Sequence, residues 1–200
     1  MKLVSMFALS LFCCAMTLWL SPQLSAQTID ATTYPMTIST GVAREDTTGT
    51  TVAVGSNVDD TPSGLIPFSG GFTFVYGGTA YTSFSVSPDG WVRLGAAGTS
   101  QFSNDLASVT NYPIVAPYWD DLATGTDGTV KYKIVGSAPT RKLIVNWSVT
   151  IPRNLTGAAN GAFQLWLYEA GGKIEFVYDT ISVVTGGYSV GFGATLNAVN

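Results

Sequence analysis

Cysteine and histidine are almost missing from this chain. Its 200 residues include two cysteines and no histidine, and Cys13 and Cys14 both lie in an apolar run near the N-terminus. The rest of the chain therefore has no cysteine, which excludes thiol chemistry and thiolate metal sites there. It also lacks the most common general base, the most common zinc ligand and the base of Ser-His-Asp catalysis. These absences exclude several large enzyme classes.

Charged residues are also scarce, at 11% of the chain, with nine basic and 13 acidic residues and a formal net charge of −4. The sequence contains no basic patch, so we expect no nucleic-acid partner. Beyond the N-terminal apolar run, no segment is long and apolar enough to cross a bilayer. We therefore expect no membrane span in the mature chain.

The N-terminal segment has the pattern of a secretory signal peptide. Lys2 precedes an apolar run over residues 3–20, and small residues follow Pro22 up to Ala26. A positive charge, an apolar centre and small residues at the exit are typical of a cleaved signal. An uncleaved membrane anchor is the alternative, which Pro22 disfavours. We expect a signal peptide over residues 1–26 and a single domain over residues 27–200, secreted or at the cell surface.

Period-two alternation of apolar and polar residues recurs through the mature chain and predicts about eleven short strands. Turn formers separate them at roughly ten-residue spacing, and only residues 103–107 favour even one helical turn. The pattern indicates an all-β fold, an antiparallel β-sandwich of jelly-roll-like type. The expected strands are residues 34–39, 51–55, 71–76, 81–86, 91–94, 114–119, 130–134, 141–151, 163–168, 173–178 and 188–192.

Several motifs, in order, carry a family resemblance over residues 34–192. The central one reads Ala116-Pro117-Tyr118-Trp119-Asp120-Asp121-Leu122, and a hairpin with the turn Ser87-Pro88-Asp89-Gly90 precedes it. Residues 172–178 and 187–192 resemble the closing hairpin and last strand of the same pattern. The chain resembles the N-terminal β-sandwich module of secreted Bacteroidetes-type proteins associated with type IX secretion, and is loosely similar to the extracellular nidogen-type (NIDO) domain.

The resemblance implies a non-catalytic sandwich near the N-terminus of a larger secreted protein, without catalytic residues to carry over. In that family, neighbouring β-modules and a C-terminal sorting domain often follow. The sequence given ends at Asn200 without such a tail. Two expectations therefore stay open: the chain is a fragment with neighbouring β-modules, or it is a module that stands alone.

Acidic residues supply the candidate metal ligands. Asp120 and Asp121 follow an apolar strand and Asp127 lies a few residues on, while Asp59 and Asp60 form a separate pair. Calcium prefers carboxylate oxygens that converge from several loops. The sequence therefore gives Asp120, Asp121 and Asp127 as candidate calcium ligands. The alternative is that these acids are solvated turn formers that bind no cofactor.

Two facing carboxylates would also suit a glycoside hydrolase. The acids available for such a pair are Asp120, Asp121, Glu169 and Glu175. Alternation places Glu175 on the same face as Lys173, which indicates a surface charge pair. A calcium-dependent glycoside hydrolase is therefore the weakest of the functional hypotheses, and we expect the protein not to be an enzyme.

Aromatic side chains supply the candidate ligand-binding residues. Trp166 and Tyr168 alternate with the apolar residues of their predicted strand, and Tyr132 lies between two lysines. An exposed aromatic row on a sheet can stack against sugar rings. The alternative is that Trp166 packs beneath a loop. We expect a secreted adhesion or recognition module that binds an extracellular glycan or protein, with a carbohydrate-binding module as the alternative.

Overall fold

The computed structural model describes residues 34–107, 109–179, 181 and 187–193. The expected signal peptide over residues 1–26 lies outside this described part, so it stays a prediction. Among the described residues, no helix is long and apolar enough to cross a membrane.

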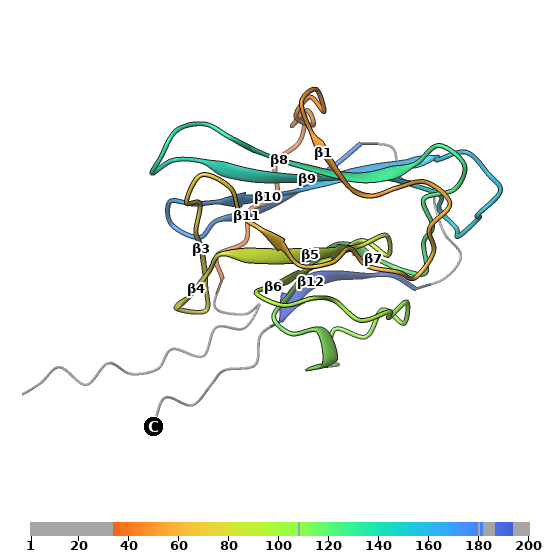
Figure 1. Ribbon diagram of the computed structural model, residues 1–200, viewed down its shortest axis with the longest axis horizontal. Helices are drawn as coiled ribbons and strands as arrows, with labels where there is room; N and C mark the ends of the chain where they lie inside the picture. Colours follow the sequence, from red (N-terminus) through yellow and green to blue (C-terminus); the bar gives the residue numbers. More distant parts are fainter. Residues whose placement is uncertain (1–33, 108, 180, 182–186, 194–200) are drawn as a thin grey trace, which may run out of the picture.

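Two five-stranded antiparallel sheets face each other as two layers (Figure 1). The first, sheet A, has the order β1-β8-β9-β10-β11 and the second, sheet B, has the order β12-β7-β6-β5-β2. Sheet A consists of β1 (Thr51–Val54), β8 (Thr129–Val135), β9 (Lys142–Val149), β10 (Gly161–Tyr168) and β11 (Ile174–Tyr178). Sheet B consists of β2 (Ile66–Pro67), β5 (Ser83–Ser87), β6 (Trp91–Leu94), β7 (Ile114–Trp119) and β12 (Ser189–Gly193). The prediction of an all-β antiparallel sandwich is confirmed.

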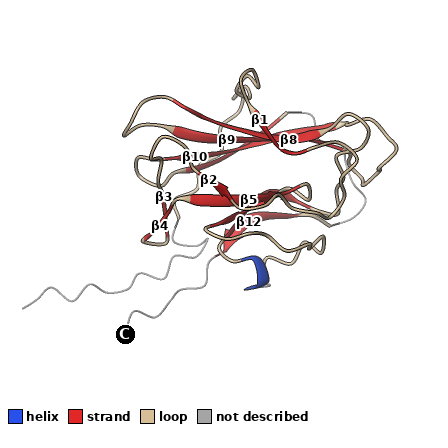
Figure 2. Cartoon of the chain, viewed as in Figure 1, coloured by secondary structure: helices blue, strands red, loops and turns tan. Residues whose placement is uncertain are grey.

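A separate hairpin, β3 (Phe74–Tyr76) and β4 (Thr79–Tyr81), stands at one end of the sandwich. The only described helix is a single 3₁₀ turn over Val109–Asn111 (Figure 2). It lies a few residues after the segment 103–107 for which the sequence favoured a helical turn. Two aromatic residues of the hairpin, Phe74 and Tyr76, are buried and close that end of the core.

The main core lies between the sheets and follows the predicted alternation. On β9 and β10 the inward residues are fully buried, and Trp147 stacks on Phe163 at 5.1 Å between ring centroids. The indole Nε1–H of Trp147 donates to the backbone oxygen of Ser87 across the core, at 2.8 Å. This buried bond ties sheet A to sheet B, because a desolvated polar group must be paired to avoid a large cost.

A second apolar cluster lies on the other side of sheet B. Trp91 and Trp119 pack there with centroids 6.2 Å apart, with Leu106 and Tyr112 packed against the same cluster. Leu106 and Tyr112 belong to the connection between β6 and β7, so described parts of this connection cover the second face of the two strands. This explains why β7 reads as a continuous apolar run, with all six residues buried.

The strand predicted over residues 34–39 is wrong for the described structure. These residues form no strand, and residues 35–40 are exposed. Alternation alone cannot form a strand, because each strand also needs a neighbour for its backbone hydrogen bonds. Pro35 further removes one of the donors that such a neighbour would use.

Candidate functional site

Three carboxylates from distant parts of the chain meet at one end of the sandwich. Asp59 and Asp60 follow β1, and Asp121 follows β7; the carboxylate oxygens that they offer lie within 4.8 Å of one another. We call these three residues the acid cluster. Its two loops are tied by hydrogen bonds between Val58 and Thr124, in which the Thr124 amide donates to the Val58 oxygen at 2.9 Å. The Val58 amide in turn donates to the Thr124 hydroxyl oxygen at 2.9 Å.

Arg153 supplies the cluster with its own cation. Its guanidinium makes a two-pronged ion pair with Asp59, in which Nε donates to Oδ1 at 2.6 Å. The same Nε lies 3.4 Å from an oxygen of Asp121, an ion pair without hydrogen-bond geometry. A bidentate arginine–carboxylate pair is the strong form of this interaction. Part of the negative charge is therefore neutralised from within the chain.

Asp60 is the member of the cluster with the least compensation. Its Oδ1 is buried and has no hydrogen-bond partner among the described residues. Burial raises the pKa of Asp60, and the neighbouring charge of Asp59 raises it further, while Arg153 lowers it. Burial likewise raises the pKa of Asp121. The cluster is thus rich in oxygen and short of positive charge, a chemistry that suits hard cations or a further guanidinium.

Asp89 lies directly behind this cluster and is fully buried. Its Oδ2 accepts from the Ser87 hydroxyl at 2.9 Å, and its Oδ1 accepts from the Leu122 amide at 3.2 Å. Burial raises the pKa of Asp89 to about 8, and the charges of Asp60 and Asp121 add to that shift. Sequence reasoning took Asp89 for a turn residue. Its position before Gly90 gave no signal that the side chain turns inward.

The structure does not bring the three predicted calcium ligands together. Asp121 joins the acid cluster, whereas the Oδ1 of Asp120 accepts from the Asp121 amide at 2.9 Å. Asp127 is exposed further along the same β7–β8 connection, where its Oδ1 accepts from the Ala159 amide at 2.8 Å. The acid cluster instead combines one of those residues with the pair Asp59 and Asp60. Calcium takes six to eight oxygen ligands, so the cluster alone supplies part of a site, and Arg153 competes for the same oxygens.

The glycosidase candidates on sheet A are ion-paired. Arg141 forms a two-pronged pair with Glu169, which holds the pKa of that carboxyl below its usual range. Glu175 pairs with Lys173 and accepts from the hydroxyl of Tyr168 at 2.5 Å. Asp120 and Asp121, the other two candidates, follow β7 of sheet B.

The predicted aromatic row is divided between two faces of sheet A. Trp166 is 6% exposed and lies on the outer face, with the ammonium of Lys142 3.8 Å from its ring centroid. Its Nε1–H donates to the side-chain oxygen of Gln164 at 2.8 Å. Tyr168 shares that face, whereas Tyr132 packs edge-on against core residue Phe84 at 5.3 Å. The three residues therefore do not form one platform.

The segment before β1 covers part of the same outer face. The Glu45 amide donates to the side-chain oxygen of Gln164, whose amide nitrogen donates back to the Glu45 carbonyl oxygen, at 2.9 and 2.8 Å. Arg44 donates to Asn146 and pairs with Asp179. This covering was not readable from the sequence, because nothing in residues 44–45 indicated which strand they would cross.

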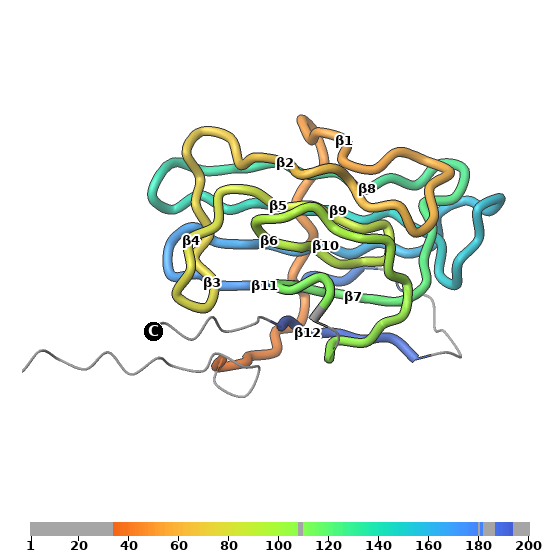
Figure 3. Tube along the Cα trace, turned by 60° about the horizontal axis from the view of Figure 1, so that its bottom comes forward, coloured from red at the N-terminus to blue at the C-terminus, as the bar shows by residue number. Residues whose placement is uncertain are grey.

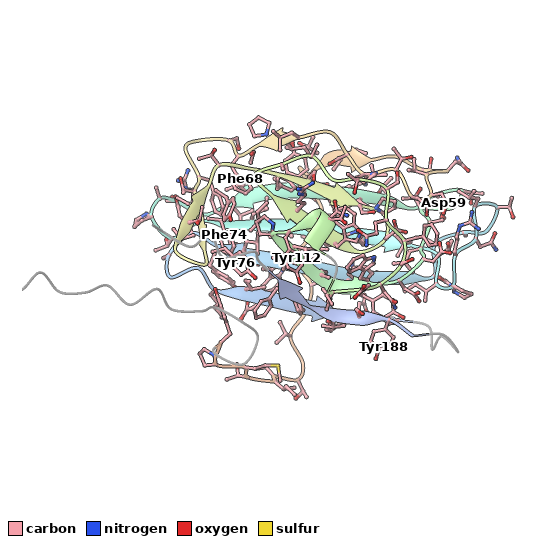
Figure 4. The ribbon with its side chains drawn as sticks, turned by 90° about the horizontal axis from the view of Figure 1, so that it is seen from below. Asp59, Phe68, Phe74, Tyr76, Tyr112 and Tyr188 are labelled. Carbon is pink, nitrogen blue, oxygen red and sulfur yellow. The ribbon has the colours of Figure 1, made fainter. Side chains whose placement is uncertain are left out.

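Exposed tyrosines gather instead along the open side of the sandwich, where β11 and β12 form the sheet margins. Tyr188, just before β12, is 54% exposed, and its ring stacks on Tyr118 at 4.7 Å with an interplanar angle of 18°. Tyr178 at the end of β11 is 41% exposed, and its hydroxyl donates to the Pro117 oxygen at 2.6 Å. We call Tyr118, Tyr178 and Tyr188 the tyrosine edge. Figure 4 shows Tyr188 projecting outward at this margin.

Polar groups accompany these rings. Because Ser189 pairs with Trp119 in the antiparallel register, the next residues, Tyr188 before β12 and Asp120 after β7, leave the two strands at the same end. Burial raises the pKa of Tyr118 to about 12, with Asp120 and Tyr188 contributing. The hydroxyl of Tyr118 is buried and has no hydrogen-bond partner among the described residues. Tyr118 is thus influenced by both the exposed ring of Tyr188 and the carboxylate of Asp120, a combination that sequence reasoning missed.

Two antiparallel sheets packed face to face around one core define a β-sandwich domain. The family model described as NIDO related matches residues 33–200, and the chain belongs to that family. No curated protein matches the chain significantly, and neither does any solved structure.

Proposed function

We propose that this chain is a secreted, non-catalytic recognition module that binds an extracellular glycan or protein along its tyrosine edge. The observation that carries the proposal is the exposure of Tyr178 and Tyr188 on one margin of the sandwich. Rings with a polar tip supply large contact area at low entropic cost, which is why tyrosine is frequent in binding surfaces. Held by the bond to Pro117 and the stack on Tyr118, these two rings are ordered before a ligand arrives.

Adhesion at the cell surface is the biological role that fits such a module. Membership of the NIDO-related family agrees with an extracellular location, as does the pattern of the N-terminal segment. The finer resemblance, to the N-terminal modules of type IX-associated secreted proteins, belongs to the same proposal. N-terminal sequencing of the exported protein checks the export step, and we expect the mature chain to begin at Gln27.

Carbohydrate binding is the second candidate, and the position of Tyr188 and Asp120 around Tyr118 favours it. A sugar ring presents an apolar face that stacks on an aromatic ring and hydroxyls that bond to a carboxylate. Trp166, the sequence candidate for such stacking, is buried under Lys142. In this proposal the sugar-binding residues are therefore Tyr188 and Asp120.

Retention on immobilised polysaccharides, together with binding to whole cells, tests both candidates. We expect Tyr188→Ala to reduce retention about tenfold or more, because stacking and hydrogen bonding contribute about 1–3 kcal/mol together. The matched control is Val75→Ala, which removes a 44% exposed side chain from the separate β3–β4 hairpin. Loss of cell binding with unchanged polysaccharide retention would favour a protein ligand. If Tyr188→Ala changes neither, the tyrosine edge is not the binding surface.

A further inference from the structure

Residues 35–43, which we call the N-terminal arm, lie outside both sheets. Met36 and Ile38 are 84% and 87% exposed, more than any other large hydrophobic residue in the described chain. Both lie on one side of the extended pattern, with Thr37 and Ser39 on the other. No backbone hydrogen bond joins the arm to another described residue. The arm therefore has the sequence of a strand and no partner for it.

The two five-stranded sheets have four edges, and β12 is the edge on which Tyr34, directly before the arm, packs. β1 has an irregular register between Val52 and Val54, β2 is two residues long and includes Pro67, and β11 carries Glu175. Bulges, proline, short length and charge are the usual protections of a sheet edge. β12 shares the first of these protections, a register shift between Ser189 and Gly191, but it is five residues long and contains neither charge nor proline. Among the described residues, no strand pairs with its outer edge.

The arm begins beside this edge and then leaves it. Tyr34 packs on Phe192 of β12 at 4.9 Å between ring centroids, and on Tyr76 at 6.4 Å. After the arm, Arg44 is held at Asp179 and Asn146 on the outer face of sheet A. Figures 3 and 4 show the arm projecting beyond β12 at the margin of the sandwich. One chain thus presents an unpaired strand segment and an unpaired strand edge next to each other.

We propose that the N-terminal arm of a second copy adds to β12, and that the exchange is reciprocal. The arm and β12 are both free of charged residues, so their approach costs no desolvation of ions. The added strand pairs backbone groups that are otherwise left to solvent, and it covers Met36 and Ile38 beside Tyr188 and Val190. A reciprocal exchange is closed by two-fold symmetry and stops at a dimer. The exchange needs no ligand and is measured separately as an oligomeric state, although it places the arm beside Tyr188 of the tyrosine edge.

Sedimentation equilibrium or light scattering across a dilution series of the purified protein tests the exchange. We expect a dimer that dissociates on dilution. The double variant Met36→Asp/Ile38→Asp places two charges in the added strand, and we expect it to raise the dissociation constant about 100-fold or more. Both side chains are exposed within one chain, so the variant should keep the melting temperature that the wild type shows when it is diluted to monomer.

The matched control is Val52→Asp/Leu65→Asp, which makes the same charge change at residues that are 53% and 50% exposed elsewhere. It should leave the dimer intact, whereas Val190→Lys on the β12 edge should dissociate it. A wild type that is monomeric at every concentration overturns the proposal, and so does a dimer that the arm variant leaves unchanged. Hydrogen-exchange protection of residues 36–39 in a monomer would also overturn it, because the arm would then pair within its own chain.

Discussion

At the scale of single residues, Asp89 is a carboxyl group that the fold removes from water. Its carboxyl is fully buried, and burial raises its pKa from 3.8 to about 8. The unfolded chain therefore releases this proton at a lower pH than the folded chain does. Between about pH 4 and pH 8 the folded state holds the extra proton, so each increase in pH favours unfolding through this group.

Asp89→Asn removes that dependence. We expect the wild type to lose up to about 1.4 kcal/mol of unfolding free energy per pH unit through this group between those limits. The variant should lack this contribution and exceed the wild type in stability above pH 8. Urea unfolding at a series of pH values measures the difference. Asp127→Asn, on an exposed loop, is the control; an equal change of slope in both variants would mean that Asp89 is not the cause.

Asp60 gives a second residue-scale prediction. Because burial and Asp59 raise its pKa, ionised Asp60 costs folding free energy at neutral pH, and Asp60→Asn should remove that cost. We expect a stabilisation of about 1 kcal/mol or less in EDTA, since the cluster is partly solvated. Thermal unfolding in EDTA measures it.

The same melting experiment with excess calcium tests the metal prediction. With Arg153 already paired to Asp59, we expect no calcium-dependent rise in the melting temperature of the wild type. A rise that Asp120→Asn/Asp121→Asn abolishes would show instead that calcium displaces or joins Arg153. Asp127→Asn distinguishes the calcium ligands predicted from the sequence from the acid cluster, because Asp127 belongs to the predicted ligands and lies outside the cluster.

At the scale of elements, the turn between β5 and β6 is pressed against β7. Gly90 has a φ of +81°, and a Cβ placed there would lie 1.8 Å from the carbonyl oxygen of Tyr118. Only glycine allows this approach, which also brings Asp89 within reach of Leu122. The Pro88-Asp89-Gly90 turn thus reverses the chain and also fixes the position of β7.

Gly90→Ala should therefore be among the most damaging small substitutions in the protein. We expect a loss of more than about 3 kcal/mol, since the positive φ and the backbone clash add. Gly71→Ala is the matched control, with a φ of +72° and open space around the added methyl group. It should lower the free energy of unfolding by about 1–2 kcal/mol, because only the left-handed backbone conformation is unfavourable at that position. Similar losses in both variants would mean that β7 moves away at little cost.

An element was predictable from the sequence where the strand that it pairs with lies nearby in the chain. Hairpins such as β5–β6 and β10–β11 were readable, because alternation and turn residues lie in the same short stretch. The segment 34–39 has equal alternation and no strand neighbour, so its prediction as a strand failed. The acid cluster also needed long-range information: nothing local relates Asp59 to Asp121, and the Val58–Thr124 bonds that join their loops appear only in the fold.

At the scale of the whole molecule, the strand order makes folding a long-range process. β1 pairs with β8, and β12 pairs with β7, and in each pair the partner residues, such as Thr51 and Tyr132, are far apart in the sequence. Sheets with such distant pairings fold slowly, in about milliseconds to seconds, because loop closure precedes the gain from contacts. Since both sheets share one core, we expect a single cooperative unfolding transition, coincident by circular dichroism and by near-ultraviolet signals. Separate transitions would mean that the two sheets unfold independently.

The burial of the four tryptophans in the described residues has a spectroscopic consequence. Trp91, Trp119 and Trp147 are at most 1% exposed, and Trp166 is 6% exposed. Their emission should be short in wavelength and hard for iodide to quench. A ligand that stacks on Tyr188 would touch none of them, so a tryptophan-fluorescence titration would stay flat even at full saturation. Binding at that margin has to be followed by tyrosine absorbance, by calorimetry or by a tryptophan introduced at position 188.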